Sequence, residues 1–353
     1  MIREGIQKLI EGCNLTMDES GEIMREVISG KATNSQTAAF LTALRMKGEG
    51  VEELIAFASV MRENSQQIHP HVQGRLVDTC GTGGDKIKTF NVSTAAAFVI
   101  AGAGIAVAKH GNRAITSKSG SADVLEKYGL NLNSSPKEIE KTIETIGIGF
   151  MFAPAFHPAM KFAAEPRREI GIRTVFNLLG PLTNPASANA QLLGVYDPRL
   201  TAPVAYALER LGCEEAMVVH GLDGLDEAST IGKTAIAHLK NNQVVQNVIS
   251  LKTFGVKKAS IADLKVTTIE ESAKTIFRVL SGKLPIDDSK VEFVLVNAAA
   301  GIIVGGKADD FIEGIEIARR SIMSGAAYGK LKALVKASRG NLGKLEEMEA
   351  IYE

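Results

Sequence analysis

The pattern of apolar residues from Leu76 onward leaves few choices of fold for this chain. Short apolar runs alternate there with longer stretches of helical periodicity. The runs read RLVD, GIAVA, IGFMFA, QLLGVY and AMVVH, and the stretches between them include SADVLEKYG and TAPVAYALERLG. Such alternation predicts an α/β fold with a mostly parallel central sheet flanked by helices. A later run, KTAIAHLKNNQVVQNVI, predicts an antiparallel hairpin that turns at Asn241–Asn242.

The first seventy residues predict helices only. Two capping boxes, Thr16-x-x-Glu19 and Thr33-x-x-Gln36, precede apolar-periodic runs, and a further helix is predicted from near Val51. We therefore expect a small all-helical domain over residues 1–70 and a larger α/β domain over residues 71–353. A segment near residues 165–185 is expected to return and join the helical domain.

The uncharged stretch from Phe90 to Ala108 could be mistaken for a membrane span. It opens with the polar run Asn91–Thr94 and has Gly102 and Gly104 in its middle. Its strictly apolar part falls short of the roughly 20 residues that a span needs. The stretch predicts a buried helix, a glycine turn and a short buried strand instead.

Charge and cysteine usage narrow the class of protein. The formal net charge is zero, so bulk charge gives no reason to expect nucleic acid or a membrane as partner. Cys13, Cys80 and Cys213 are isolated and lack metal-ligand spacing. The N-terminal residues contain no apolar signal-peptide core. Reduced thiols and a cytoplasmic location are therefore expected.

A glycine-rich loop, GTGGD, follows the first predicted strand. Gly81 and Gly84 would let backbone N–H groups converge on an anion, and a helix starting near Ser93 would add its positive N-terminus. The loop lacks the Gly-Lys-Ser/Thr of a Walker A motif, and Lys86 stands where a dinucleotide fingerprint needs a third glycine. The alternative is a tight strand-to-helix turn without a ligand.

The second loop, KHGNRAITSKSGSAD, follows the next predicted strand. Lys109, His110, Arg113 and Lys118 supply positive charge, and three serines supply hydroxyls before a helix begins. Clustered donors at a helix start suit a phosphate group. A solvated basic loop is the alternative for this stretch alone. Two such loops after adjacent strands predict one ligand that carries two separated phosphate groups.

Charged side chains near two other strands could bind a cation and a carboxylate. Asp226-Glu227 follows the AMVVH strand, and Mg²⁺ prefers one or two carboxylates together with waters and phosphate oxygens. Arg167, Arg168 and Arg173 are predicted in one helix-like segment, and an arginine can fork onto a carboxylate. The alternative for the acidic pair is an ordinary acidic turn, and the alternative for the arginines is a set of surface ion pairs.

The two phosphate loops, the acidic pair and the arginines together favour a reaction whose rate depends on positioning the substrates and on electrostatic stabilisation. No serine–histidine–acid set stands out, and His110 and His157 are predicted to be loop histidines without a partner that would make either a base. Transfer from a 1-diphosphorylated sugar phosphate is such a reaction, because its leaving group is pyrophosphate.

The motifs together resemble the anthranilate phosphoribosyltransferase family of tryptophan biosynthesis. They are GTGGD…TFNVST, KHGNR…SKSGSADVLE, HPAMK, R..IGIRT.FN.LGPL.NP and GLDE, and the match as a whole runs in order from about Leu41 to Glu227. The resemblance is weaker after Ser229. It implies a helical domain, an α/β domain that binds phosphoribosyl pyrophosphate (PRPP), an active site at the hinge, and a homodimer formed through the helical domain. It also implies transfer of the phosphoribosyl group to the amine of anthranilate with Mg²⁺ as cofactor.

The resemblance also implies ligand-binding residues. For PRPP they are Gly81, Gly84, Asp85, Thr89, Asn91, Val92, Ser93, Thr94, Lys109, His110, Gly111, Asn112, Arg113, Ala114, Ile115, Thr116, Ser117 and Ser121. For anthranilate they are Gly81, His110, Asn112, Arg167 and Pro181, with Arg167 facing the carboxylate. For Mg²⁺ they are Ser93, Asp226 and Glu227. No residue is assigned as a catalytic base.

Three rival interpretations are weighed against this one. Pyrimidine nucleoside phosphorylases share the architecture but would need an SGR-centred loop where this chain has KHGNR. A nucleic-acid-binding homologue would need a basic face or a broken GTGGD motif. A transferase for another aromatic amine stays open, because only Arg167 and the shape of the pocket select the acceptor.

Overall fold

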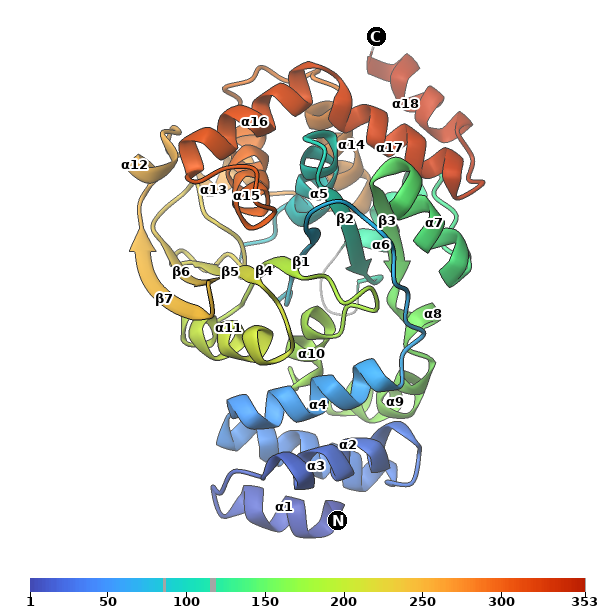
Figure 1. Ribbon diagram of the computed structural model, residues 1–353, viewed down its shortest axis with the longest axis vertical. Helices are drawn as coiled ribbons and strands as arrows, with labels where there is room; N and C mark the ends of the chain where they lie inside the picture. Colours follow the sequence, from blue (N-terminus) through green and yellow to red (C-terminus); the bar gives the residue numbers. More distant parts are fainter. Residues whose placement is uncertain (85–86, 115–118, 353) are drawn as a thin grey trace.

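The computed structural model describes residues 1–84, 87–114 and 119–352. The first four helices form a bundle at one end of the molecule (Figure 1). They are α1 (Ile2–Ile10), α2 (Met17–Ile28), α3 (Asn34–Lys47) and α4 (Val51–Glu63). Both predicted capping boxes are confirmed, because Thr16 and Glu19 exchange hydrogen bonds at the start of α2, as Thr33 and Gln36 do at the start of α3.

Later segments return to this bundle. They are α9 (Lys161–Ile170) and α10 (Phe176–Leu182), and the short α8 (Ala153–Phe156) precedes them in the chain. Helix α9 packs against α2 and α3, and α10 packs against α4. Buried apolar residues of α9 and α10 share one core with the bundle and with one face of the sheet. The bundle is therefore joined to the rest of the molecule through α9 and α10.

A seven-stranded sheet forms the centre of the larger part, with strand order β3-β2-β1-β4-β5-β6-β7. The strands are β1 (Leu76–Gly81), β2 (Ala106–Gly111), β3 (Ile148–Phe152), β4 (Ala190–Gly194), β5 (Glu215–Gly221), β6 (Thr234–Lys240) and β7 (Gln243–Ile249). The first five are parallel, and β6 and β7 add antiparallel strands. The predicted mostly parallel sheet is confirmed.

The predicted hairpin is confirmed as well. Strands β6 and β7 pair from Lys240 and Gln243 outward, and the two turn residues are Asn241 and Asn242. Their φ angles are 52° and 56°, in the left-handed region that asparagine tolerates. The sequence Asn-Asn therefore fixes where the edge of the sheet folds back.

Helices cover both faces of the sheet (Figure 1). Helices α5 (Val92–Gly102) and α15 (Ser289–Val304) pack side by side on one face, and α11 (Thr201–Arg210) packs on the other. The remaining helices are α6 (Ser121–Lys127), α7 (Pro136–Ile146), α12 (Leu251–Phe254), α13 (Ile261–Leu264), α14 (Ile269–Leu280), α16 (Phe311–Met323), α17 (Ala326–Ala337) and α18 (Gly343–Tyr352). The stretch Phe90–Ala108 forms α5, a turn and the start of β2, as predicted. No helix in the described ranges is long and apolar enough to cross a membrane.

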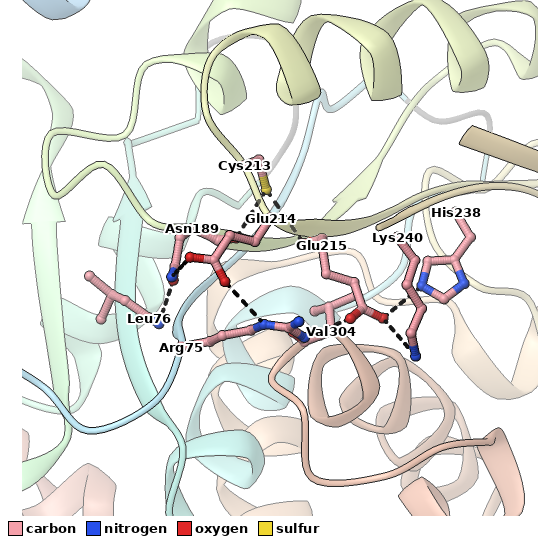
Figure 2. A network of polar contacts seen from close by, with 9 residues as sticks. All are labelled: Arg75, Leu76, Asn189, Cys213, Glu214, Glu215, His238, Lys240 and Val304. Atoms are coloured by element: carbon pink, nitrogen blue, oxygen red, sulfur yellow. Dashed lines mark hydrogen bonds and ion pairs between the residues drawn. The ribbon is translucent and has the colours of Figure 1, made fainter. Parts of the chain in front are cut away.

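A charged network ties strands together at the edge of the sheet where β1 and β5 begin and the antiparallel β6 ends (Figure 2). The buried Glu215, at the start of β5, accepts hydrogen bonds from Arg75 Nη1 at 2.6 Å and from His238 Nε2 at 2.9 Å. Arg75 also donates to the carbonyl of Val304 at the end of α15, and Lys240 Nζ lies 3.6 Å from Glu215. The network joins β1, β5, β6 and α15 at the edge opposite the loops described below.

Candidate active site

Three loops that follow β1, β2 and β5 meet at the carboxyl edge of the sheet. The Asp226 carboxylate, from the loop after β5, accepts a hydrogen bond from the Gly83 backbone N–H at 2.8 Å. A Cβ atom at Gly81 would lie 2.6 Å from Asp226 Oδ2, so this approach requires glycine. Gly84 has a φ of 84°, which other residues adopt only with strain. The loops that the motifs singled out are therefore packed together.

A polar cavity of about 280 Å³ lies between these loops. Most of the candidate PRPP and metal residues line it: Gly81, Thr89, Asn91, Val92, Ser93, Lys109, His110, Gly111, Asn112, Arg113, Ala114, Ser121, Asp226 and Glu227. Two do not. Thr94 is buried in the first turn of α5, and the Gly84 carbonyl accepts a hydrogen bond from Arg173. The candidates Asp85, Ile115, Thr116 and Ser117 lie outside the described residues.

Lys109 is a buried cation at the floor of this cavity. Its Nζ donates to the Thr79 carbonyl at 2.6 Å and to Ser93 Oγ at 3.4 Å. Burial lowers the pKa of Lys109, and the charge of the nearby Asp78 carboxylate opposes that shift. The position differs from the predicted loop, because β2 continues through Gly111 by pairing with β3 as far as Phe152. Lys109 and His110 are thus held by the sheet.

The acidic pair fits a divalent cation. Asp226 and Glu227 both line the polar cavity beside Ser93. Burial raises the pKa of Asp226, while the hydrogen bond from Gly83 opposes the shift. A cation would offset the desolvation of that carboxylate, and two carboxylates beside a phosphate site are a set that Mg²⁺ accepts. Within the described ranges, no cluster of three or more His, Cys, Asp or Glu side chains could hold a metal without other ligands.

A second, more apolar cavity of about 440 Å³ adjoins the first. It lies between the sheet edge and helices α9 and α10, and Met61 of α4 also lines it. All five candidate anthranilate residues line it: Gly81, His110, Asn112, Arg167 and Pro181. The two cavities share part of their walls, including Gly81, His110 and Asn112. A ligand in one can therefore reach a ligand in the other.

Arg167 supplies a cation to the second cavity. Its guanidinium lies 5.0 Å from the centre of the Phe176 ring, and burial lowers its pKa. In the part of the chain that the structure describes, Arg167 forms no ion pair. A half-buried cation of this kind is stabilised when an anionic ligand binds beside it.

The prediction that Arg167, Arg168 and Arg173 share one helical segment is wrong. Helix α9 ends at Ile170, and Gly171 caps it in the left-handed conformation. Arg173 lies beyond the cap, 4.8 Å over the Tyr196 ring. Arg168 is exposed near Glu165, as the surface alternative expects. Gly171 was the signal in the sequence for the helix end.

The prediction that His110 is a loop histidine is also wrong, because His110 lies in β2. His157 does lie in a loop, between α8 and the next helical turn. Both side chains are buried, with ring centroids 5.1 Å apart. His110 Nδ1 lies 3.3 Å from the Gly180 carbonyl, and the Nε2 atoms of both rings have no hydrogen-bond partner among the described residues. Burial lowers the pKa of His110 to about 3 and that of His157 to about 4. Both rings are therefore neutral near pH 7.

Two family models match this chain. Residues 3–65 match a glycosyl transferase family, helical bundle domain, and residues 73–328 match a glycosyl transferase family, a/b domain. A relative from Methanocorpusculum labreanum, named anthranilate phosphoribosyltransferase, is 50% identical over 340 residues, covering 96% of this chain and 99% of its own length. One from Alkaliphilus metalliredigens with the same name is 48% identical over 339 residues, covering 96% and 99%.

Solved structures are similar over the same extent. The anthranilate phosphoribosyltransferase of Thermus thermophilus superposes with a TM-score of 0.89 at 41% identity, covering 95% of this chain and 99% of that one. The Saccharomyces cerevisiae enzyme in complex with PRPP and Mg superposes with a TM-score of 0.86 at 29% identity, covering 96% and 98%.

Proposed function

Since the chain belongs to the anthranilate phosphoribosyltransferase family, we propose that its two adjoining cavities are the donor and acceptor sites of that reaction. The enzyme transfers the 5-phosphoribosyl group of PRPP to the amine of anthranilate, a step of tryptophan biosynthesis that also gives pyrophosphate. One observation carries the assignment of the sites. A polar cavity between glycine-rich and basic loops shares a wall with an apolar cavity that holds an arginine without an ion pair among the described residues.

PRPP occupies the polar cavity in this proposal. The N-terminus of α5 faces its pyrophosphate, the glycine loop lines the cavity beside it, and Lys109 adds a fixed positive charge. Ser93, Asp226 and Glu227 would hold Mg²⁺, which when bound neutralises the charge that develops on the departing pyrophosphate. Asp85, Ile115, Thr116 and Ser117 belong to the same proposed set on the ground of their motifs alone.

Anthranilate occupies the apolar cavity. Arg167 binds its carboxylate, while Pro181 and the neighbouring apolar side chains contact its ring. Asn112 and Gly81 line both cavities, so they lie where the amine of the acceptor would meet the sugar of the donor.

The reaction is a displacement at C1 of the ribose. The bond from C1 to the pyrophosphate oxygen breaks and its electron pair leaves with pyrophosphate, while the amine nitrogen forms a bond to C1 from the opposite face. The configuration inverts, and the amine proton leaves to solvent or to the departing pyrophosphate. His110 and His157 stay neutral and buried, and neither is proposed as an obligatory base. The enzyme contributes position and electrostatics.

The wider organisation is proposed on the same family membership. A domain boundary falls near residue 70, between the two matched regions. A homodimer forms through the helical domain, and the protein is cytoplasmic. Exposed apolar side chains on that domain, among them Ile10 and Met46, support such an interface.

The test is the loss of anthranilate fluorescence in the presence of purified protein, PRPP and Mg²⁺, with EDTA as the control. Loss that requires both PRPP and the metal is the expected result. If fluorescence persists while calorimetry still detects PRPP binding, the donor site stands and the acceptor assignment fails. If neither is observed, both assignments fail.

A further inference from the structure

Asn91 joins the two phosphate-binding loops. It is the N-cap residue of α5 and lines the polar cavity, but its side chain makes no capping bond. Instead, its Oδ1 accepts a hydrogen bond from Ser119 Oγ at 2.7 Å, and its Nδ2 donates to the Ser119 carbonyl at 3.1 Å. The side chain therefore spans from the loop after β1 to the end of the loop after β2.

Ser272 of α14 forms hydrogen bonds with both the main chain and the side chain of Asn91. The Asn91 backbone N–H donates to Ser272 Oγ at 3.1 Å, and the Ser272 hydroxyl donates to Asn91 Oδ1 at 2.8 Å. Ser272 is fully buried and is not among the described residues that line the cavity. One hydroxyl thus holds both the main chain and the side chain of a residue that would touch PRPP.

Helix α14 is itself anchored on the same two regions. The Val266 N–H, in the segment before α14, donates to the Lys88 carbonyl at 3.1 Å, which continues an isolated bridge between Lys265 and Thr89. The Tyr128 hydroxyl, next to α6, donates to the Ala273 carbonyl at 2.6 Å. These bonds leave Ser272 little freedom to move relative to either loop.

We propose that Ser272 is a positioning residue for PRPP, acting through Asn91 to hold the two phosphate-binding loops at a fixed separation before the donor binds. The proposal rests on the assignment of PRPP to the polar cavity. A ligand with two separated phosphate groups binds best to loops that are already placed, because less ordering is then required on binding. The apolar acceptor cavity includes neither Asn91 nor Ser119 in its described lining, so anthranilate binding is expected to be independent of Ser272.

The test compares steady-state kinetics of Ser272→Ala with those of Ser281→Ala. Ser281 ends the same helix, and its hydroxyl donates to the Phe277 carbonyl within that helix, so it controls for the loss of a hydroxyl from α14. One hydrogen bond contributes about a factor of five to an equilibrium constant, so the loss of two predicts a KM for PRPP raised about five- to twenty-fivefold in Ser272→Ala. The KM for anthranilate and all constants of Ser281→Ala should stay within about twofold of the wild-type values in the same experiment.

A second variant separates positioning from general stability. Ser119→Ala removes the other hydroxyl bonded to Asn91 Oδ1, and its effect on the KM for PRPP should not add to that of Ser272→Ala. Additive effects, equal changes in both KM values, or a lowered kcat that follows a lowered Tm would overturn the proposal. An unchanged Ser272→Ala enzyme would also overturn it. If the wild-type enzyme does not consume anthranilate, it is the proposed function that fails. The assay of the wild-type protein shows this before any variant is made, so the two failures can be distinguished.

Discussion

Arg167 is a half-buried cation that we propose binds the carboxylate of anthranilate. Its guanidinium lies beside Phe176 at the wall of the acceptor cavity, and it forms no ion pair within the described ranges. Arg168, its neighbour in the same helix, is exposed and near Glu165. The two residues are neighbours in sequence, but Arg167 lines the apolar cavity whereas Arg168 lies on the surface, so only Arg167 is proposed to bind a ligand.

Replacing Arg167 by alanine should mainly impair the use of anthranilate. The loss of a charge-assisted pair with the carboxylate is expected to lower kcat/KM for anthranilate about ten- to hundredfold, with the KM for PRPP little changed. Steady-state kinetics with each substrate varied in turn measure this. Arg168→Ala is the matched control, and an equal loss there would place the acceptor carboxylate elsewhere.

The buried histidine pair predicts a pH-dependent stability. In the folded protein the pKa of His110 is about 3 and that of His157 about 4, whereas both lie near 6.5 in the unfolded chain. As pH falls below about 6.5, the unfolded chain binds protons that the folded one does not, so the free energy of unfolding decreases. Urea unfolding at pH 7 and pH 5 should show this decrease, and a variant with both histidines replaced by glutamine should show less of it. Identical pH dependence in the variant would contradict the assignment.

The acidic pair predicts a defect in metal use. Asp226→Ala combined with Glu227→Ala should raise the Mg²⁺ concentration needed for half-maximal activity at least about tenfold or abolish metal activation, because the cavity then lacks both carboxylates. Activity against Mg²⁺ concentration at fixed PRPP measures the change. Asp223→Asn is the control in the same loop, since Asp223 is not among the described lining residues. A normal metal response in the double variant would remove the pair from the metal site.

At the scale of elements, the position where a strand or helix ends depends on contacts with distant segments as much as on the nearby sequence. The glycine-rich and basic loops, the capping boxes and the Asn-Asn hairpin could be predicted, because each depends on residues close together in the sequence. The extension of β2 through Lys109 and His110 could not, since it depends on pairing with β3. Ser272 could not be found either, because its partner Asn91 is 181 residues away and no motif surrounds it.

The charged network around Glu215 should contribute strongly to stability (Figure 2). Glu215→Ala removes the buried acceptor of Arg75 and His238, and breaking a buried ion pair typically costs about 3 kcal/mol or more. The adjacent Glu214 is exposed and lies 3.6 Å from Arg75, so Glu214→Ala should cost less than about 1 kcal/mol. Urea denaturation of both variants measures the difference, and equal costs would mean that burial of Glu215 contributes nothing.

At the scale of the whole molecule, the helical domain presents apolar side chains that this chain alone does not cover. Ile10 at the end of α1 and Met46 near the end of α3 are 68% and 84% exposed. If the homodimer forms through this domain, Ile10→Glu with Met46→Glu should shift sedimentation from dimer to monomer, because charges at an apolar interface are not solvated. Ile351→Glu is the control, as Ile351 is 70% exposed in α18 of the other domain. A wild-type monomer, or an equal response of the control, would contradict this interface.

The two cavities have walls of different origin, and this difference bears on how such an enzyme can evolve. The polar cavity is built from loops of the central sheet, whereas the apolar cavity also takes walls from α4 of the helical bundle and from α9 and α10, which pack against that bundle. Under the proposed assignment of the two sites, substitutions on those helices change which amine is accepted while the loops proposed to bind the diphosphate remain intact. An enzyme of this kind could therefore evolve to use new acceptors through substitutions in the helices that line the apolar cavity, while selection conserves the loops of the sheet. Directed-evolution libraries confined to residues 153–182 would test for such changes in acceptor.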